Sequence, residues 1–353
     1  MKKKATSNTP AELKVTKNYA MLKFKLMQKR DFQPFGTVSA LTLGGGGLGQ
    51  VWGETTREEA VKTVNLAIRK GITHLDVAPM YGKGEAEKVV GEVFKGKDLG
   101  DVKITTKCRL GTLPDSEVYE RLNSSLNKSL DNLNLDRVDL FLLHSQLIKD
   151  DFQLYTLNEY RDTNTTSLSC FYNSVIPAFE RLKKEGKIGS WGIGGLGQTQ
   201  AIHEALNHDI QPEAIQCVVN PLNSAGAIGY VDKDFDPQKI LTESQKVGVP
   251  ILGIRAVQAG ALTLAMDREP HPSGFDTKDF EDYDKAEPFR NLASEWKMNP
   301  SILAHRYALS VKEVSSVILG VKNREELLDC LEAESLGELE QDQISAIDIA
   351  LSR

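Results

Sequence analysis

Four side chains that suit proton transfer stand where β-rich segments of the sequence end: Asp76, Tyr81, Lys107 and His144. A tyrosine hydroxyl has an ordinary pKa of about 10, and a neighbouring ammonium favours the phenolate and lowers that pKa. Lys107 can supply the ammonium, and Asp76 can hold it in an ion pair. His144 can hydrogen-bond a substrate oxygen. Together these residue types indicate reduction of a carbonyl group, with Tyr81 passing the proton.

Each of these residues also has an ordinary structural interpretation. Asp76 and Lys107 can form a structural ion pair, and His144 can be a satisfied core histidine. Tyr81 can be a loop aromatic beside a glycine. The placement of this set at the ends of three successive segments is what favours a shared site.

The segments around these residues alternate between short β-rich runs and longer runs with helical periodicity. Eight strands are predicted: 38–43, 72–76, 102–107, 137–143, 188–193, 214–219, 249–254 and 314–319. Amphipathic helices are predicted between them, the first capped by Thr55 or Thr56 and stopped by Gly71. This alternation predicts a single α/β domain over residues 31–353, a (β/α)8 TIM barrel with its chemistry at the carboxyl ends of the strands.

Two glycine runs, 44–49 and 192–197, follow the order G-x-G-x-x-G and raise a doubly wound, dinucleotide-binding sheet as the alternative fold. In that fold the glycine turn opens a helix directly, whereas residues 50–54 intervene before the predicted helix. We therefore interpret the glycines as positions where strand-end backbone approaches a bound ligand closely.

The order and spacing of these motifs resemble the aldo-keto reductase family from about Phe35 to the end of the chain. The stretch "GITHLDVAPMYGKGEAEKVVGEVF" resembles its Asp and Tyr signature, "VKITTK" its lysine strand and "LDRVDLFLLH" its histidine strand. The resemblance implies a (β/α)8 barrel that reduces aldehydes, ketones or sugar carbonyls with NADPH, or runs the reverse oxidation. It also implies the catalytic tetrad Asp76, Tyr81, Lys107 and His144, and cofactor binding without a Rossmann fold.

The same resemblance implies where the nicotinamide end of the cofactor would lie. Gly45, Gly46 and Gly47 correspond to the loop that meets the nicotinamide ribose. Trp52, in the same loop, is expected to line the substrate pocket. Gln216 corresponds to the glutamine that holds the carboxamide.

Two cofactor positions depart from the family pattern. The usual Ser-Asn pair after the fifth strand is replaced by Gly194 and Gly195, which removes two side-chain hydrogen bonds. The aromatic residue that stacks on the ring is replaced by Ile254, next to Arg255. Cofactor binding and control of the hydride face are therefore expected to differ here.

The last predicted strand leads into a segment that resembles the family's adenosine-phosphate site. Gly320 and Lys322 would meet the phosphate region, and Lys322 or Arg324 can pair with a 2′-phosphate. Glu326 stands where many relatives place Arg and would repel that phosphate. On balance the sequence favours NADP(H), with NAD(H) as the alternative. Lys322 and Arg324 can also be ordinary charged residues at the start of a helix, with no role in cofactor binding.

The charge distribution restricts the partners. The first 30 residues contain nine Lys or Arg and one acidic residue, whereas the whole chain has a net charge of −6, so the rest is acidic. We expect no nucleic-acid partner, and we predict a disordered basic extension over residues 1–30. A membrane-binding or nucleic-acid-binding head is the alternative, but it lacks interleaved aromatic residues and an amphipathic repeat.

Apolar runs and cysteines indicate the compartment. No run has the length of a secretory signal core or a membrane span, so we expect a cytoplasmic protein with no membrane partner. Four cysteines are scattered without a C-x-x-C pair: Cys108, Cys170, Cys217 and Cys330. This pattern predicts reduced thiols, and the five-residue spacing of His203 and His208 predicts no metal site.

The long loops bear on substrate and function. Residues 145–170 and 265–285 are polar and rich in Asp and Tyr, which favours polyols or sugars over greasy substrates. An NADPH-binding regulatory subunit with little turnover is the alternative function, since barrels of this family can act as redox-sensing partners. The sequence leaves the physiological substrate, the reaction direction and the oligomeric state open.

Overall fold

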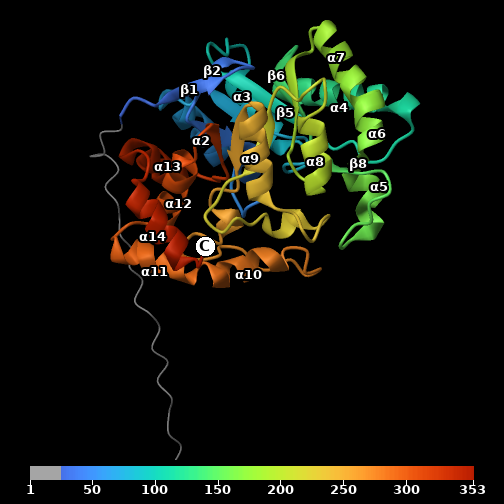
Figure 1. The fold of residues 1–353 in the computed structure, drawn as a ribbon. Helices are drawn as coiled ribbons and strands as arrows, with labels where there is room; N and C mark the ends of the chain where they lie inside the picture. The colour runs from blue at the N-terminus through green and yellow to red at the C-terminus, as the bar shows by residue number, and fades with distance from the viewer. Residues whose placement is uncertain (1–24) are drawn as a thin grey trace, which may run out of the picture.

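The computed structural model describes residues 25–353, in which eight parallel strands close into a barrel surrounded by helices (Figure 1). Around the barrel the strands follow the order β3, β4, β5, β6, β9, β10, β11 and β12, and β12 pairs with β3. Their bounds are β3 Leu41–Gly44, β4 His74–Asp76, β5 Lys103–Cys108, β6 Val138–Leu143, β9 Ile188–Ile193, β10 Ile215–Val218, β11 Ile251–Ile254 and β12 Val314–Leu319. Each of the eight predicted segments overlaps a barrel strand. The predicted (β/α)8 fold is confirmed, and the doubly wound alternative is wrong.

Helices follow the strands and surround the barrel (Figure 1). Their bounds are α1 Gly45–Leu48, α2 Arg57–Arg69, α3 Glu85–Phe94, α4 Asp115–Leu133, α5 Arg161–Asn164, α6 Leu168–Cys170, α7 Ile176–Lys184, α8 Thr199–Leu206, α9 Pro237–Val247, α10 Thr277–Lys285, α11 Glu287–Glu295, α12 Pro300–Ser310, α13 Arg324–Leu336 and α14 Gln341–Ala350. The start of α2 illustrates the local cause, because the Thr56 hydroxyl accepts the backbone N–H of Glu59. From there Val64 and Ala67 bury fully against the barrel.

A two-stranded hairpin that the sequence analysis did not predict covers the amino-terminal end of the barrel. Its strands are β1 (Lys29–Phe32) and β2 (Gly36–Ser39). Phe32 packs in one cluster with Leu140 on β6 and Leu252 on β11, which are not neighbouring strands, so the cluster lies inside the barrel.

The predicted basic extension over residues 1–30 falls mostly outside the described residues. Residues 25–30 are described, and they lie on the barrel. Lys29 and Arg30 are part of β1, and the backbone N–H of Gln28 donates to Glu334 on α13 at 2.8 Å. Residues 25–30 therefore belong to the barrel domain, contrary to the predicted boundary at residue 31.

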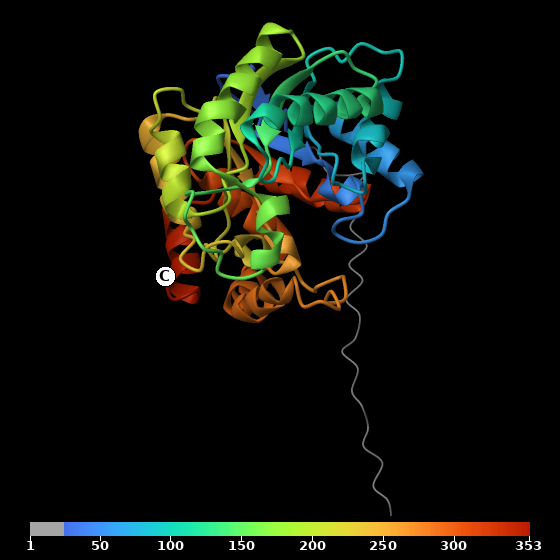
Figure 2. The same cartoon turned by 90° about the vertical axis from the view of Figure 1, so that its right-hand side faces the viewer.

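The segment between β11 and β12 carries helices of its own. The polar stretch 265–285 ends in α10, and α11 and α12 follow it. Figures 1 and 2 both show α10 and α11 at the end of the molecule opposite α7. Phe289 and Leu303 from this segment pack with Ile347 of α14 in a second core cluster. Among residues 25–353, no helix is long and apolar enough to cross a membrane.

Candidate active site

Asp76 and Lys107 form a buried ion pair at the carboxyl ends of β4 and β5. The parallel register places Asp76 beside Thr105, two residues before Lys107, so both side chains reach the same end of the barrel. Lys107 Nζ lies 2.5 Å from Asp76 Oδ1 and donates to the carbonyl of Val77 at 2.9 Å. Neither side chain is exposed beyond 3%. The buried carboxylate of Asp76 and the carbonyl of Val77 therefore fix the position of the Lys107 ammonium group.

Tyr81 and His144 lie next to this ion pair. Lys107 Nζ lies 3.4 Å from the Tyr81 hydroxyl. The rings of Tyr81 and His144 are perpendicular, with centroids 6.1 Å apart. Both side chains are half-buried, whereas Lys107 and Asp76 are buried. The structure thus brings the four predicted residues together, with Tyr81 and His144 more exposed than Asp76 and Lys107.

The electrostatics of this cluster differ in one respect from the expectation. Burial raises the pKa of Tyr81 above its ordinary value, and although Lys107 lowers it, the ammonium does not outweigh burial. Burial also lowers the pKa of His144 well below its ordinary value, with further lowering from Lys107 and Arg109. Burial alone would lower the pKa of Lys107, but Asp76 and Tyr81 raise it overall. At neutral pH, Tyr81 is therefore protonated, His144 neutral and Lys107 charged.

Gln216 and the two glycines after β9 complete this end of the site. The Gln216 amide donates to Asp76 Oδ2 at 2.8 Å and so ties the carboxylate from its other side. Gly195 has a φ of +60°, and a Cβ there would lie 1.9 Å from the carbonyl oxygen of Gln216. At Gly194 a Cβ would have its nearest contact at 3.3 Å, with the ring of His144 at 3.7 Å. Close backbone approach thus requires glycine at position 195, whereas a Cβ at position 194 would be tight but would need only a small shift of its neighbours.

The first glycine run approaches protein backbone more closely than the sequence interpretation assumed. A Cβ at Gly47 would lie 2.0 Å from the carbonyl oxygen of Val321. At Gly49 it would lie 2.5 Å from the carbonyl carbon of Tyr81. Gly47 and Gly49 therefore allow the loops after β3, β4 and β12 to pack together, a role that the sequence analysis did not assign to them.

Trp52 lies over the loops that follow β3 and β12. Its indole Nε1 would be 2.6 Å from a Cβ at Gly46 and 3.2 Å from a Cβ at Gly320. Its ring centroid lies 5.8 Å from the guanidinium carbon of Arg255. Trp52 thus lies close to Gly46, Gly320 and Arg255, which are all predicted to contact the cofactor. Gly45, in the same first turn, lies against Val77.

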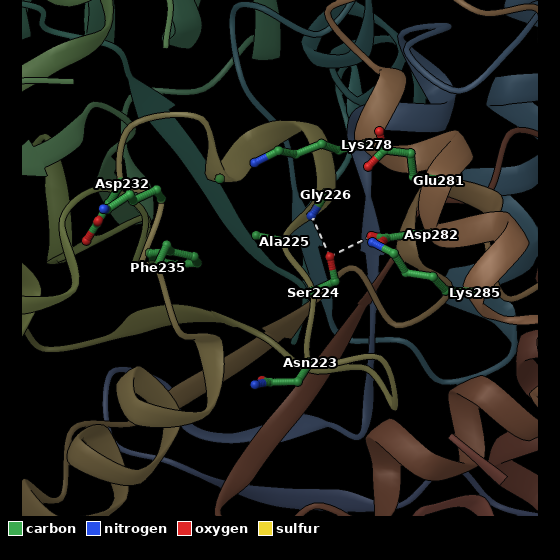
Figure 3. Close-up of a pocket in the computed structure, with 12 residues that line it drawn as sticks. Asn223, Ser224, Ala225, Gly226, Asp232, Phe235, Lys278, Glu281, Asp282 and Lys285 are labelled. Carbon is green, nitrogen blue, oxygen red and sulfur yellow. Dashed lines mark hydrogen bonds and ion pairs between the residues drawn. The ribbon is translucent and has the colours of Figure 1, made fainter. Parts of the chain in front are cut away.

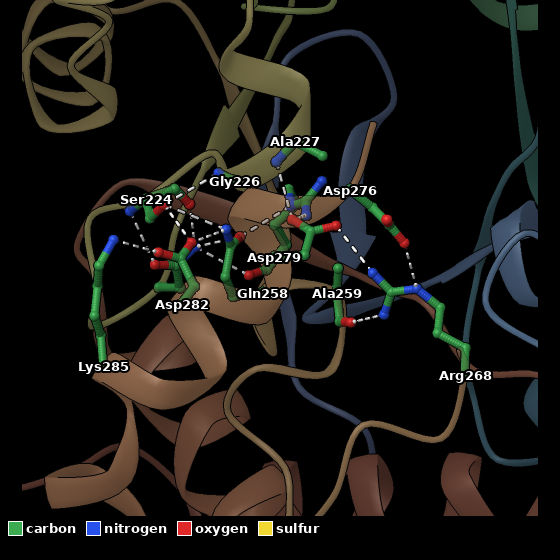
Figure 4. Close-up of polar contacts among 12 residues, drawn as sticks. Ser224, Gly226, Ala227, Gln258, Ala259, Arg268, Asp276, Asp279, Asp282 and Lys285 are labelled. Carbon is green, nitrogen blue, oxygen red and sulfur yellow. Dashed lines mark hydrogen bonds and ion pairs between the residues drawn. The ribbon is translucent and has the colours of Figure 1, made fainter. Parts of the chain in front are cut away.

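Arg255, the residue after Ile254 at the end of β11, contacts a network of polar side chains, of which Gln258, Asp279 and Asp282 are labelled in Figure 4. It has a positive φ of 58°, and its Nη2 lies 2.5 Å from Asp279 Oδ1 on α10. Asp279 also accepts from Arg268 at 3.0 Å, and Gln258 joins Arg255 to Asp282. The carboxylates of α10 therefore hold the loop that follows β11.

The two cations at the start of α13 have acidic partners. Lys322 Nζ lies 2.5 Å from Asp267 Oδ2 and also contacts the carboxylate of Glu326. The backbone N–H of Lys322 donates to Glu326 as well, at 2.9 Å. Arg324 forms a two-pronged pair with Glu59, with both N···O distances at 2.9 Å. Both predicted phosphate-binding cations are thus engaged by carboxylates.

A surface hollow of about 200 Å³ lies apart from the tetrad, between the loop after β10 and α10 (Figure 3). Ser224 accepts from the N–H of Gly226 and donates to Asp282 within it. Its other charged lining residues include Lys278 and Glu281. None of the four tetrad residues lines this hollow, so it is distinct from the candidate active site.

Sequence reasoning missed Arg109, two residues beyond Lys107. Its Nη1 donates to Asn164 Oδ1 at 3.0 Å, and its Nη2 lies 3.5 Å from the sulfur of Met80, next to Tyr81. Its position immediately after the lysine strand is the signal that identifies it as part of the rim. Arg109 therefore belongs to the surroundings of the tetrad.

The closed barrel of eight parallel strands surrounded by helices is a (β/α)8 barrel, with the four predicted residues together at one end. Residues 40–352 match the family model described as "Aldo/keto reductase family". The chain belongs to the aldo/keto reductase family, and its members use nicotinamide cofactors. It is therefore an enzyme.

Individual relatives agree with this assignment. L-Galactose dehydrogenase of Arabidopsis thaliana is 28% identical over 320 residues, which cover 89% of this chain and 91% of that protein. The uncharacterized oxidoreductase YqkF of Bacillus subtilis is 25% identical over 313 residues, which cover 85% and 90%. Among solved structures, the glycerol dehydrogenase from Gluconobacter oxydans matches with a TM-score of 0.64 and 19% identity, covering 93% of this chain and 95% of that one. The structural match supports the fold.

Proposed function

We propose that this enzyme transfers a hydride between nicotinamide and an aldehyde, ketone or sugar carbonyl, with Tyr81 as the general acid and base. The observation that carries the proposal is the position of Lys107 Nζ, which lies within hydrogen-bonding distance of both Asp76 and the Tyr81 hydroxyl. A proton leaving Tyr81 would create a phenolate beside this ammonium. The barrier to proton transfer is therefore lowered where charge develops.

The protonation states assign a role to each residue. Because the pKa of Tyr81 is raised by burial, the hydroxyl carries its proton at neutral pH and can give it to a substrate oxygen. Asp76 keeps Lys107 charged, and Gln216 orients Asp76. His144, neutral because burial lowers its pKa, can donate one hydrogen bond to the same oxygen without adding a charge.

The residues at the nicotinamide end fit a bound nicotinamide. Gln216 is held in place at Asp76, and a Cβ at Gly194 would lie 3.7 Å from the ring of His144. The cofactor, when bound, supplies or accepts the hydride. Gln216, Gly194 and Gly195 would hold its nicotinamide end, with Gly45, Gly46 and Gly47 on the other side and Ile254 and Arg255 after β11.

The cofactor preference that we propose is NADH, the reverse of what the sequence alone favoured. A 2′-phosphate carries a charge of about −1.5 to −2 at neutral pH and needs cations that are free to meet it. Lys322 already has two carboxylate partners and Arg324 has one. Carboxylates at this position suit the ribose hydroxyls of NADH, for which they can accept hydrogen bonds.

The substrate class that we propose is a polar, hydroxylated carbonyl compound. The name of one relative, L-galactose dehydrogenase, points to a sugar substrate. Polar residues from the loops after β5, β6 and β10 lie near the tetrad, among them Arg109, Asn164 and Tyr230. We also propose a cytoplasmic location, which the four free, buried cysteines support.

The test is Tyr81→Phe, assayed with NADH or NADPH and a panel of aldehydes, dicarbonyls and sugars. Loss of the hydroxyl should lower kcat by about 10²- to 10⁴-fold, while cofactor affinity, measured by fluorescence titration, stays within about twofold. Tyr119→Phe is the matched control, because its hydroxyl only donates to Glu185 on the surface. Cofactor binding by the wild type without turnover of any compound would favour a regulatory subunit instead.

A further inference from the structure

His74 is a buried titratable side chain that the proposed mechanism does not use. It lies on β4, two residues before Asp76, and is fully buried. Its ring centroid lies 5.0 Å from that of Phe35 and 6.5 Å from that of Phe32, which belongs to the cluster inside the barrel. Because successive side chains of a strand point to opposite faces, His74 and Asp76 share one face. His74 therefore lies in the barrel interior beneath the carboxylate of Asp76.

Both ring nitrogens of His74 contact hydroxyl groups on neighbouring strands. Nδ1 lies 2.9 Å from Thr42 Oγ1 on β3, and Nε2 lies 2.7 Å from Thr105 Oγ1 on β5. Thr42 Oγ1 lies in turn 2.6 Å from Ser316 Oγ on β12. Burial, together with the ammonium of Lys107, lowers the pKa of His74 to about 3, so the ring is neutral at neutral pH. A neutral imidazole has one donor and one acceptor, and the two threonines engage both.

The contact between His74 and Thr105 lies one layer below the Asp76–Lys107 ion pair. Thr105 precedes Lys107 by two residues on β5, so these two side chains also share one face. The same two strands are thus joined twice inside the barrel, by a hydrogen bond of 2.7 Å and by the buried ion pair. A buried, satisfied polar network holds its members in one arrangement. The lower contact therefore helps to fix the strand ends that carry the ion pair.

The contact most sensitive to a shift of these strands joins Lys107 to Tyr81. Lys107 Nζ lies 3.4 Å from the Tyr81 hydroxyl, beyond the range of about 2.7–3.2 Å for an ordinary N–H···O bond. The same atom lies only 2.5 Å from Asp76 Oδ1 and 2.9 Å from the carbonyl oxygen of Val77. A small displacement of the ammonium would leave these shorter contacts in place and break the longer one. Tyr81 would therefore be the first group of the site to respond.

We propose that His74 is a positioning residue, which holds β4 and β5 through Thr105 so that the ammonium of Lys107 reaches the Tyr81 hydroxyl. This role rests on the proposed function, because it concerns the same proton donor. His74 touches none of the reacting groups and takes no part in the proton transfer itself. The β1–β2 hairpin contributes, because Phe32 packs against the ring from the amino-terminal end of the barrel.

The test compares Thr105→Val with Thr105→Ser. Valine keeps the shape of threonine without the hydroxyl, whereas serine keeps the hydroxyl and loses a methyl group. Thr105→Val should lower kcat for carbonyl reduction by about 10-fold with KM within about twofold, and Thr105→Ser should retain most of kcat. Thr106→Val is the matched control, because the Thr106 hydroxyl donates at 2.7 Å to Glu87 of α3, outside the barrel. It should leave kcat within about twofold.

A second measurement reports on Tyr81 without any turnover. The ultraviolet absorbance of the phenolate is recorded against pH for each protein with and without Tyr81→Phe, and the difference isolates Tyr81 from the other tyrosines. Because the neighbouring ammonium lowers the pKa of Tyr81, its displacement in Thr105→Val should move this titration to higher pH. Asp76 and Arg109, the other charged groups that act on Tyr81, are unchanged. Thr105→Ser and Thr106→Val should titrate as the wild type does, and a merely loosened fold would not move the titration.

The outcomes separate this role from the proposed function. Equal changes in Thr105→Val and Thr105→Ser would assign the effect to packing of the methyl group and overturn the positioning role, as would an unchanged Tyr81 titration in Thr105→Val. Thr42→Val removes the other partner of His74 and should act in the same direction with a smaller effect. If Thr105→Val does not fold, Thr42→Val decides, and an unchanged titration there overturns the role. If no compound is reduced but the Tyr81 titration moves as expected, the positioning role stands and the reductase proposal falls.

Discussion

Positively charged side chains have different carboxylate partners at the two ends of the proposed cofactor- and substrate-binding groove. At the ends of β4 and β5, Lys107 has a single carboxylate partner that is buried with it, and the nearby Arg109 has none among residues 25–353. At the start of α13, Lys322 lies between Asp267 and Glu326, of which Asp267 is 56% exposed.

This difference in burial indicates which of the ion pairs the stability of the fold depends on. A buried ion that loses its partner remains uncompensated, because the interior cannot solvate it. An exposed pair gains little net free energy and can exchange its partner for water or for a ligand. The Asp76–Lys107 pair is therefore part of the framework, whereas the pairs of Lys322 can rearrange when a cofactor binds.

The sharpest test of this contrast is Lys107→Met. We expect the free energy of unfolding to fall by about 3–5 kcal/mol, because Asp76 would stay buried without its ammonium. Turnover should fall below detection, since the phenolate of Tyr81 would lose its neighbouring charge. Urea unfolding and NADH oxidation measure the two effects separately.

The double variant Asp76→Asn with Lys107→Met separates stability from chemistry. It removes both charges, and the amide oxygen can still accept the hydrogen bond from Gln216. Most of the lost stability should return, but not turnover. Equal instability of the single and double variants would contradict the view that an uncompensated carboxylate causes the loss.

A smaller effect is expected where the nicotinamide-binding glycines depart from the family pattern. Gly195→Asn should destabilise the protein by about 1–3 kcal/mol, because its Cβ would lie 1.9 Å from the carbonyl oxygen of Gln216. The matched change Gly194→Ser should cost about 1 kcal/mol or less, since the nearest contact of that Cβ is 3.3 Å. Thermal unfolding compares the two variants, and equal losses would refute the steric explanation.

Local patterns in the sequence predicted the barrel and the position of the tetrad. The strands are apolar runs between amphipathic helices, and the side chains of Asp76, Lys107 and His144 end or follow such runs. Because the carboxyl ends of the strands converge in a parallel barrel, we could predict that these side chains lie close together without knowing any long-range contact. The β1–β2 hairpin was missed since its short polar strands have no clear alternation, and its one buried anchor, Phe32, depends on the barrel interior.

Long-range partners explain what the sequence did not predict. Glu59 lies 265 residues before Arg324, and Asp267 lies 55 residues before Lys322. Nothing in the local pattern of α13 indicates that these carboxylates meet its cations. The lowered pKa expected for Tyr81 was wrong for a similar reason, because the extent of burial follows from packing. Arg109 was missed because its distinguishing property is the lack of a carboxylate partner.

The smallest expected effect concerns the exposed end of the groove. In Asp267→Asn with Glu326→Gln, Lys322 loses both acidic partners and becomes available to a 2′-phosphate. The ratio of the NADPH to the NADH dissociation constant should fall about tenfold, which corresponds to about 1.4 kcal/mol. Fluorescence titration of each cofactor measures this ratio, and Asp284→Asn, an exposed acid on α10, is the control for a change in net charge. The effect should shrink at high salt because these charges are partly exposed. If the ratio of dissociation constants does not change, or changes equally in the control, the carboxylates around Lys322 do not set the cofactor preference. A fall in the double variant alone would show that the charged side chains at this end of the groove select the cofactor. These charges can rearrange, unlike the buried Asp76–Lys107 pair.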